Sequence, residues 1–107
     1  NKTTAEAQGW RLKQEVPGFV AMSSHTRGDP AAAPGSLPLQ WVFSDGLSSV
    51  SLFVEPFDAQ RHRREGASSM GATQSLTRRL GEYWLTAMGE VPPATLREFA
   101  QALERLR

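Results

Sequence analysis

The feature that most constrains this chain is an Asp-Gly pair between two segments in which apolar residues alternate. The pair Asp45-Gly46 is preceded by LQWVFS and followed by LSSVSLFVEP. This arrangement predicts a hairpin with a two-residue type I′ turn, because both central residues must tolerate positive φ. Such a turn would pair Ser44 with Leu47 and would place Trp41 opposite Val50. The face that we expect to be buried carries Leu39, Trp41, Phe43, Val50, Leu52 and Val54.

Shorter segments elsewhere in the chain, bounded by turn residues, predict further strands. These segments are 10–12, 19–23, 72–79 and 83–88. The stretches 25–38 and 56–71 contain prolines and glycines without a periodic pattern, which predicts loops. Residues 1–8 are polar and unpatterned, as is typical of a linker or a frayed terminus.

The chain ends in an amphipathic segment that begins at a proline pair. Pro93 suits the first turn of a helix, where no intrahelical N–H donor is needed. Apolar residues then recur every three or four positions up to Leu106, which predicts a helix over about 93–106. Strands followed by one terminal helix predict an α+β fold for residues 9–107. We expect an antiparallel sheet of about five or six strands with the helix packed on one face.

The composition excludes several classes of protein. The formal charge is +1, so no strong field favours nucleic acid or an anionic membrane as a partner. No apolar run approaches the roughly 20 residues of a membrane-spanning helix. There is no cysteine, and His25 and His62 have no partners at helical spacing. We therefore expect no disulfide, no metal and no other cofactor.

The sequence also lacks the patterns that enzymes of the common hydrolase and nucleotide-binding classes carry. It contains no G-x-S-x-G elbow and no phosphate-binding glycine loop, and its carboxylates occur singly at turns and strand ends. A nucleophile, a base and an orienting group cannot be assembled from these residues. We expect a domain that is not an enzyme. The chain begins at Asn1 without Met or a signal peptide, which favours an excised domain.

One concentration of charge and one possible apolar patch remain as candidates for partner binding. Arg61, Arg63 and Arg64 could bind an acidic peptide or a lipid phosphate through their guanidinium groups. The simpler interpretation is that this run only solvates a loop. Phe53 and Trp84 fall on the second face of the predicted sheet and could supply apolar contacts. Alternatively, both aromatic side chains are buried in the core.

Five segments in order resemble a known family. They are W-R-L at 10–12, P-G-F at 17–19, the run F-S-D-G-L-S-S-V-S-L-F-V-E at 43–55, G-A-T at 71–73 and G-E-V-P-P-A-T-L at 89–96. In combination they are similar to the C-terminal domain of the MucB/RseB regulators of extracytoplasmic-stress sigma factors. The resemblance spans nearly the whole chain.

The resemblance implies a periplasmic regulator in which an N-terminal domain similar to the LolA/LolB lipoprotein carriers precedes this one. The whole protein would bind the periplasmic part of a transmembrane anti-sigma factor and shield it from proteolysis, so restraining the envelope-stress response. Lipid signals such as lipopolysaccharide would relieve that protection. The resemblance assigns no individual binding residues. The alternative interpretation is a lipid- or lipoprotein-associated envelope scaffold domain with the same fold.

Overall fold

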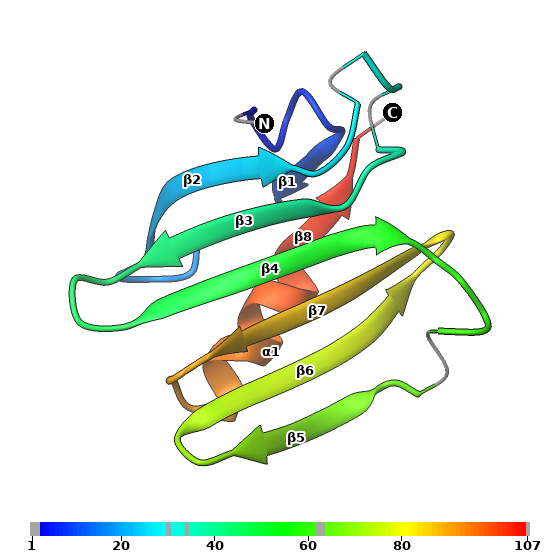
Figure 1. The fold of residues 1–107 in the computed structure, drawn as a ribbon. Coiled ribbons are helices and arrows are strands. Elements are labelled where there is room, and N and C mark those ends of the chain that lie inside the picture. Colours follow the sequence, from blue (N-terminus) through cyan, green and yellow to red (C-terminus); the bar gives the residue numbers. More distant parts are fainter. Residues whose placement is uncertain (1–2, 30, 34, 62–63, 107) are drawn as a thin grey trace.

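The structure, a computed structural model, describes residues 3–29, 31–33, 35–61 and 64–106. Its main layer is a six-stranded antiparallel sheet in the order β2-β3-β4-β7-β6-β5 (Figure 1). These strands are β2 Val20–Thr26, β3 Leu39–Ser44, β4 Ser49–Pro56, β5 Gly66–Met70, β6 Thr73–Leu80 and β7 Tyr83–Gly89. The remaining elements are β1 Trp10–Leu12, α1 Pro93–Ala102 and β8 Leu103–Arg105, and β1 pairs with β8 in a separate ribbon.

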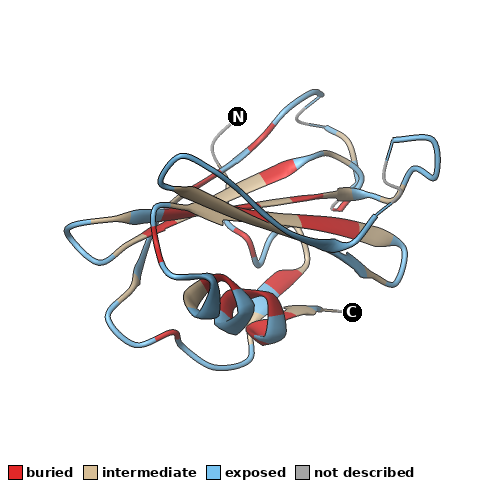
Figure 2. Ribbon diagram, turned by 90° about the horizontal axis from the view of Figure 1, so that it is seen from below, coloured by how far each residue is buried: buried red, intermediate tan, exposed pale blue. Residues whose placement is uncertain are grey.

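The α+β class and the helix on one face of an antiparallel sheet are confirmed. Helix α1 and the β1–β8 ribbon lie on the same side of the six-stranded sheet (Figures 1 and 2). The core lies between these two layers, with Leu52, Leu85 and Phe99 fully buried. The ring of Phe99 lies 4.8 Å from that of Phe43 and 5.4 Å from that of Phe19, measured between centroids. No helix in the described part of the chain is long and apolar enough to cross a membrane.

The β3–β4 hairpin has the predicted faces, but its predicted register is wrong by two residues. Ser44 pairs with Ser49, and Trp41 lies opposite Leu52 rather than Val50. Because side chains alternate with a period of two, a shift of two residues leaves every side chain on its expected face. Trp41 therefore still points toward the core side, where it is half-buried.

The register differs because the turn is centred one residue later than expected. The N–H of Asp45 donates to the carbonyl oxygen of Ser48, so Gly46 and Leu47 are the central residues. The Asp45 carboxylate accepts the N–H groups of Ser48 at 2.7 Å and Leu47 at 2.9 Å. Both hydrogen bonds lower the pKa of Asp45, and the bond from Ser48 has the larger effect. Gly46 has φ 93°, and glycine is the only residue type with positive φ in the described chain, so Leu47 does not have it. A type I′ turn needs positive φ at both central residues and is therefore excluded here.

Replacing Gly46 with valine tests this turn. A Cβ at Gly46 would meet no atom within 4 Å, so the cost comes from positive φ alone and not from a clash. We expect Gly46→Val to lower the free energy of unfolding by more than about 1 kcal/mol, measured by urea denaturation. The matched control is Leu47→Val at the neighbouring exposed position, which should change it little. Equal stability of Gly46→Val and wild type would contradict the turn geometry.

The helix is shorter than predicted, because the chain leaves it at Leu103 to form β8. Leu103 has an extended backbone, φ −68° and ψ 128°, and pairs with Leu12 of β1. The N–H of Lys13 donates to the Ala102 carbonyl at 2.6 Å and so occupies an acceptor at the end of the helix. Leu103 stays buried, but on a strand, so the apolar stripe continues while the backbone changes. The expected helix up to Leu106 is wrong for this reason.

Two stretches expected to be loops contain strand residues. Strand β2 continues through His25 and Thr26 into the stretch predicted to begin a loop at 25. Strand β5 falls within 56–71 and pairs along its whole length with β6. All five residues of β5, GASSM, are exposed. A strand that buries none of its side chains carries no apolar alternation by which the sequence could reveal it.

The described part of the predicted linker packs against the domain. Ala5 is buried, and the N–H of Thr3 donates to the carbonyl of Ser24 in β2 at 3.0 Å. The Arg105 guanidinium donates from Nη1 to the carbonyl of Gln8 at 2.6 Å. Residues 3–8 are thus ordered by contacts with distant parts of the chain, which a polar composition does not reveal.

Truncation of Phe99 tests the packing of the helix. Phe99→Ala should cost about 3–5 kcal/mol because it removes a fully buried ring that contacts two other aromatic rings. For a small domain this is a large share of the total stability and should be visible as a lowered Tm. Arg97→Ala, at an exposed position of the same helix, is the control and should leave Tm nearly unchanged. A Tm for Phe99→Ala equal to that of the control would contradict the packing.

Candidate partner-binding surfaces

The sheet face opposite α1, called here the outer face, has a mixed apolar and hydroxyl character. Phe53 pairs with Thr86 across β4 and β7, and Ser51 lies between Val42 and Met88. Phe53, Val42 and Met88 are all half-buried. The second apolar patch predicted from the sequence is therefore interrupted by hydroxyl side chains. Leu47 is 97% exposed at the tip of the hairpin.

A hollow of about 300 Å³ lies beside Phe53, where β2 ends and the chain leaves β4. This outer-face hollow is lined by His25, Arg27, Gln40, Phe53, Glu55 and Arg61, together with Pro38 and parts of Leu39 and Val54. Two of the predicted binding residues, Phe53 and Arg61, thus come together. A turn closed by the Arg61 N–H and the Asp58 carbonyl, 3.0 Å apart, brings Arg61 back toward the sheet.

The charges around the outer-face hollow are unbalanced. Arg61 Nη1 lies 3.4 Å from Glu55 Oε1, and the Arg61 side chain is 69% exposed. An exposed pair of this kind contributes only about 0–1 kcal/mol to stability and leaves the arginine free to bind a stronger anion. Arg27 lines the same hollow and adds a second guanidinium group. Two arginines against one carboxylate favour an acidic ligand here.

The structure does not bring the other basic candidates into this hollow. Arg64 is exposed on the approach to β5, where its carbonyl accepts a hydrogen bond from Thr77 Oγ1 at 3.0 Å. Arg63 and its neighbour His62 lie outside the described residues. Arg78 and Arg79 are adjacent in sequence but point to opposite faces of β6, and Arg78 Nη1 donates to the carbonyl of Ala100 at 3.1 Å. A charge run in the sequence is thus divided among several surfaces.

Trp84 is on the outer face, as its alternation predicts, but it is covered. Its exposed fraction is 6%, and its ring centroid lies 5.9 Å from that of Phe57. The Arg79 guanidinium carbon lies 3.8 Å from the centroid of the Phe57 ring, within the range of a cation–π interaction. Arg79, Phe57 and Trp84 therefore form a stack with the tryptophan beneath. The groups that face solvent at this point are Phe57 and Arg79.

Truncation of Phe57 tests whether it covers Trp84. In a Trp41→Phe background, the two remaining tryptophans are both buried, so fluorescence quenching by acrylamide should be weak. Phe57→Ala should expose the Trp84 indole, raise its quenching constant and shift its emission to longer wavelength. Leu47→Ala, which removes an equally apolar but fully exposed side chain, should leave both unchanged. Unaltered quenching in Phe57→Ala would contradict the stack.

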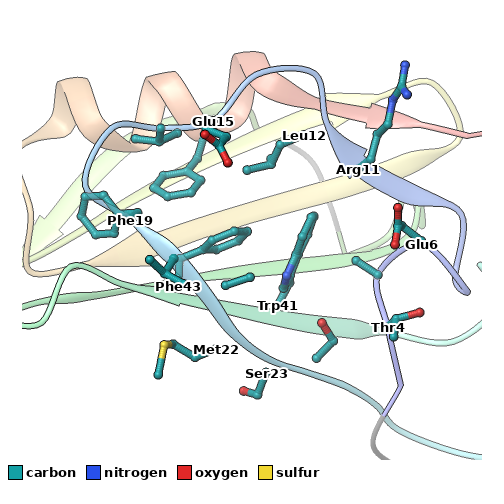
Figure 3. Close-up of a pocket in the computed structure, with 16 residues that line it drawn as sticks. Thr4, Glu6, Arg11, Leu12, Glu15, Phe19, Met22, Ser23, Trp41 and Phe43 are labelled. Atoms are coloured by element: carbon teal, nitrogen blue, oxygen red, sulfur yellow. The ribbon is translucent and has the colours of Figure 1, made fainter.

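A larger hollow of about 580 Å³ lies on the other side of the sheet, next to edge strand β2. It opens between β2 and β3 and the segment 12–19, toward which Trp41 and Phe43 project (Figure 3). We call it the β2 groove; its lining includes Glu6, Arg11, Glu15, Phe19, Val20, Met22, Trp41, Phe43 and Phe99. This groove was not predicted from the sequence. A possible signal is the pair Val20 and Met22, two apolar residues that alternate with Phe19, Ala21 and Ser23 in a predicted strand.

No group of three or more His, Asp or Glu side chains among the described residues is placed to hold a metal ion. The lowered pKa of Asp45 is explained by the amide groups of its own turn. The outer-face hollow and the β2 groove each combine aromatic and charged side chains, an arrangement suited to binding.

Comparison with known proteins identifies related chains. A model of the MucB/RseB C-terminal domain matches residues 4–104. The crystal structure of MucB in complex with MucA(peri) superposes with a TM-score of 0.74 at 27% identity, over 92% of this chain and 37% of that one. The Pseudomonas aeruginosa MucA/MucB complex gives the same score and identity over 92% of this chain and 35% of that one. The chain thus spans about a third of the solved chains it matches. No curated protein matches it significantly.

Proposed function

Because the chain belongs to the MucB/RseB C-terminal domain family, we propose that it is the smaller domain of a periplasmic regulator that binds the periplasmic part of a transmembrane anti-sigma factor. Binding would shield that segment from proteolysis and so restrain the envelope-stress response. The observation that carries the proposal is the likeness, over 92% of this chain, to two structures in which MucB is bound to MucA.

The rest of the regulator is part of the same proposal. Since the chain spans only about a third of the solved MucB chains, an N-terminal LolA-like domain would contribute further contacts to the anti-sigma factor and to any lipid signal. The role of the present domain would be non-enzymatic, because holding a peptide out of reach of a protease requires a binding surface and no bond-breaking group.

The outer-face hollow is the surface that we assign to this partner. Arg27 and Arg61 can bind a carboxylate through paired N–H donors, and Phe53 offers an apolar surface beside them. Charge complementarity of this kind mainly speeds association, while the apolar contact slows dissociation. The expected partner segment is acidic and amphipathic, as the sequence analysis anticipated for Arg61 and Phe53.

Reversal of the two arginine charges tests this assignment. We expect Arg27→Glu/Arg61→Glu to weaken binding of the periplasmic anti-sigma segment by about tenfold or more at low salt, and by less at high salt, because exposed charges are screened. The measurement is titration calorimetry at two salt concentrations. The control is Arg97→Glu, an exposed position on α1. Arg64→Glu, at a site apart from the hollow, should have a smaller effect than the double reversal.

Two outcomes of that titration would count against the assignment or the proposal. Equal affinities for wild type and the double reversal at low salt would remove the outer-face hollow from the interaction. Absence of binding by the wild-type chain, combined with binding to vesicles that contain lipopolysaccharide, would favour the lipid-associated scaffold instead.

A further inference from the structure

We propose that the free edge of β2, together with the β2 groove, binds an extended segment of a partner protein that alternates apolar and basic side chains. This inference concerns a surface on the helix side of the sheet and does not depend on the anti-sigma proposal.

Strand β2 is an edge strand, since β3 is its only neighbour in the six-stranded sheet. An edge strand presents unpaired N–H and C=O groups to which another chain can add by β-augmentation. The molecule itself begins such an addition at one end of β2, where the Thr3 N–H donates to the Ser24 carbonyl at 3.0 Å. From Val20 to Ser23, no backbone group among the described residues continues that row on the free edge.

The side chains along this edge are those of a binding strand rather than of a protected edge. Val20 is 65% exposed and Met22 is 63% exposed. Exposed edges usually carry a charged residue such as lysine, or a proline, that discourages pairing, whereas residues 20–24 of β2, VAMSS, contain neither. Val20 pairs with Ser44 and so lies on the outer face, whereas Met22 lies at the register shift beside the groove. An added strand would lie beside both residues and would exchange the exposed backbone groups for hydrogen bonds.

The β2 groove gives alternate side chains of an added strand a place to enter. Trp41 and Phe43 project into it from β3, and Phe99 of α1 lines it as well. Trp41 is only half-buried although it is on the core side of the sheet. An apolar side chain that enters here would complete the burial of the indole, which is the contact from which a peptide gains most affinity.

The charges at the rim specify the partner. Glu6 and Glu15 line the groove, and neither carboxylate forms an ion pair with another described residue. Arg11, the basic residue of the lining, forms an exposed pair with Glu104. The lining therefore carries two carboxylates against one guanidinium group, which favours lysine or arginine in the incoming segment.

The same features argue against a second copy of this chain as the occupant. A second copy would add its own β2, which contains no lysine or arginine, and so would not supply the basic side chains that Glu6 and Glu15 favour. The register also shifts between Ala21 and Ser23, and such a bulge increases local twist and disfavours long, flat pairing of identical edges. A short segment of a different chain can carry basic side chains, and it needs to follow the twisted edge over only a few residues.

The test uses the complete 107-residue chain, labelled with ¹⁵N, and synthetic peptides of about eight residues with blocked ends. In the probe peptide, every second residue is valine and the residues between are lysine or threonine. One control peptide replaces lysine with glutamate, and another carries N-methyl groups along one edge of its backbone so that it cannot pair. We expect the probe to shift and protect the amides of residues 20–24, and both control peptides to bind at least about tenfold more weakly.

Matched substitutions distinguish binding at the β2 edge from nonspecific hydrophobic binding elsewhere on the surface. Met22→Lys should weaken binding of the probe by about tenfold or more, while Met70→Lys, at a still more exposed methionine on the opposite edge strand β5, should not change it. Glu6→Gln/Glu15→Gln should reduce the preference for the lysine peptide over the glutamate peptide. Thermal melts of each variant verify that the fold is retained.

Several results would overturn the proposal. Equal binding of the N-methylated peptide, amide shifts confined to other strands, or wild-type affinity in Met22→Lys would each exclude strand addition at β2. Self-association that Met22→Lys abolishes, measured by analytical ultracentrifugation, would make a second copy the occupant. The probe is not the anti-sigma segment, so none of these results bears on the proposed function. That proposal is tested separately, by the titration with the periplasmic anti-sigma segment.

Discussion

The ten-residue helix α1 is too short to cover one face of the six-stranded sheet. The arrangement of the other segments on that face depends on this constraint. Helix α1 lies mainly against β6 and β7, and although Phe99 reaches the Phe43 ring of β3, much of the region near β3 is left to other parts of the chain. The β1–β8 ribbon covers part of it, with Trp10 buried against Tyr83 at a centroid distance of 5.0 Å. Neither element covers the part of the sheet face next to β2, and the β2 groove opens there.

Both ends of the chain are needed for this cover, and Arg105 holds them together. Its guanidinium donates to the Gln8 carbonyl and lies 4.8 Å from the centroid of the Tyr83 ring. Gly9 and Gly35 lie so close to the guanidinium that a Cβ on either would overlap with it. A polar residue at the last strand thus orders the N-terminal turn and anchors the loop between β2 and β3. This explains why residues 3–8 belong to the domain despite their linker-like composition.

The sequence predicted those elements whose side chains are partly buried, because burial produces a period that can be recognised. The faces of the hairpin follow from alternation, and a two-residue error in register leaves them unchanged because side chains alternate with a period of two. The error itself depends on which residue of the turn takes positive φ. Strand β5 buries nothing, and β8 continues the apolar stripe of α1, so neither leaves a pattern of its own. For the same reason the binding candidates were only partly predicted: Phe53 and Arg61 meet, whereas Trp84 is covered by Phe57, a contact between segments that no local pattern encodes.

The two hollows differ in charge because the two faces of the sheet are built differently. On the outer face no helix competes for the sheet, so the loops after β2 and β4 bring Arg27 and Arg61 beside Phe53. On the helix side the cover comes from the N-terminal segments, which bring Glu6 and Glu15 to the edge of β2. A partner with both acidic and basic stretches could therefore contact both faces by passing around the β2 edge, where Val20 and Met22 are exposed. The short helix that leaves the core incomplete is thus also what makes β2 available to another chain.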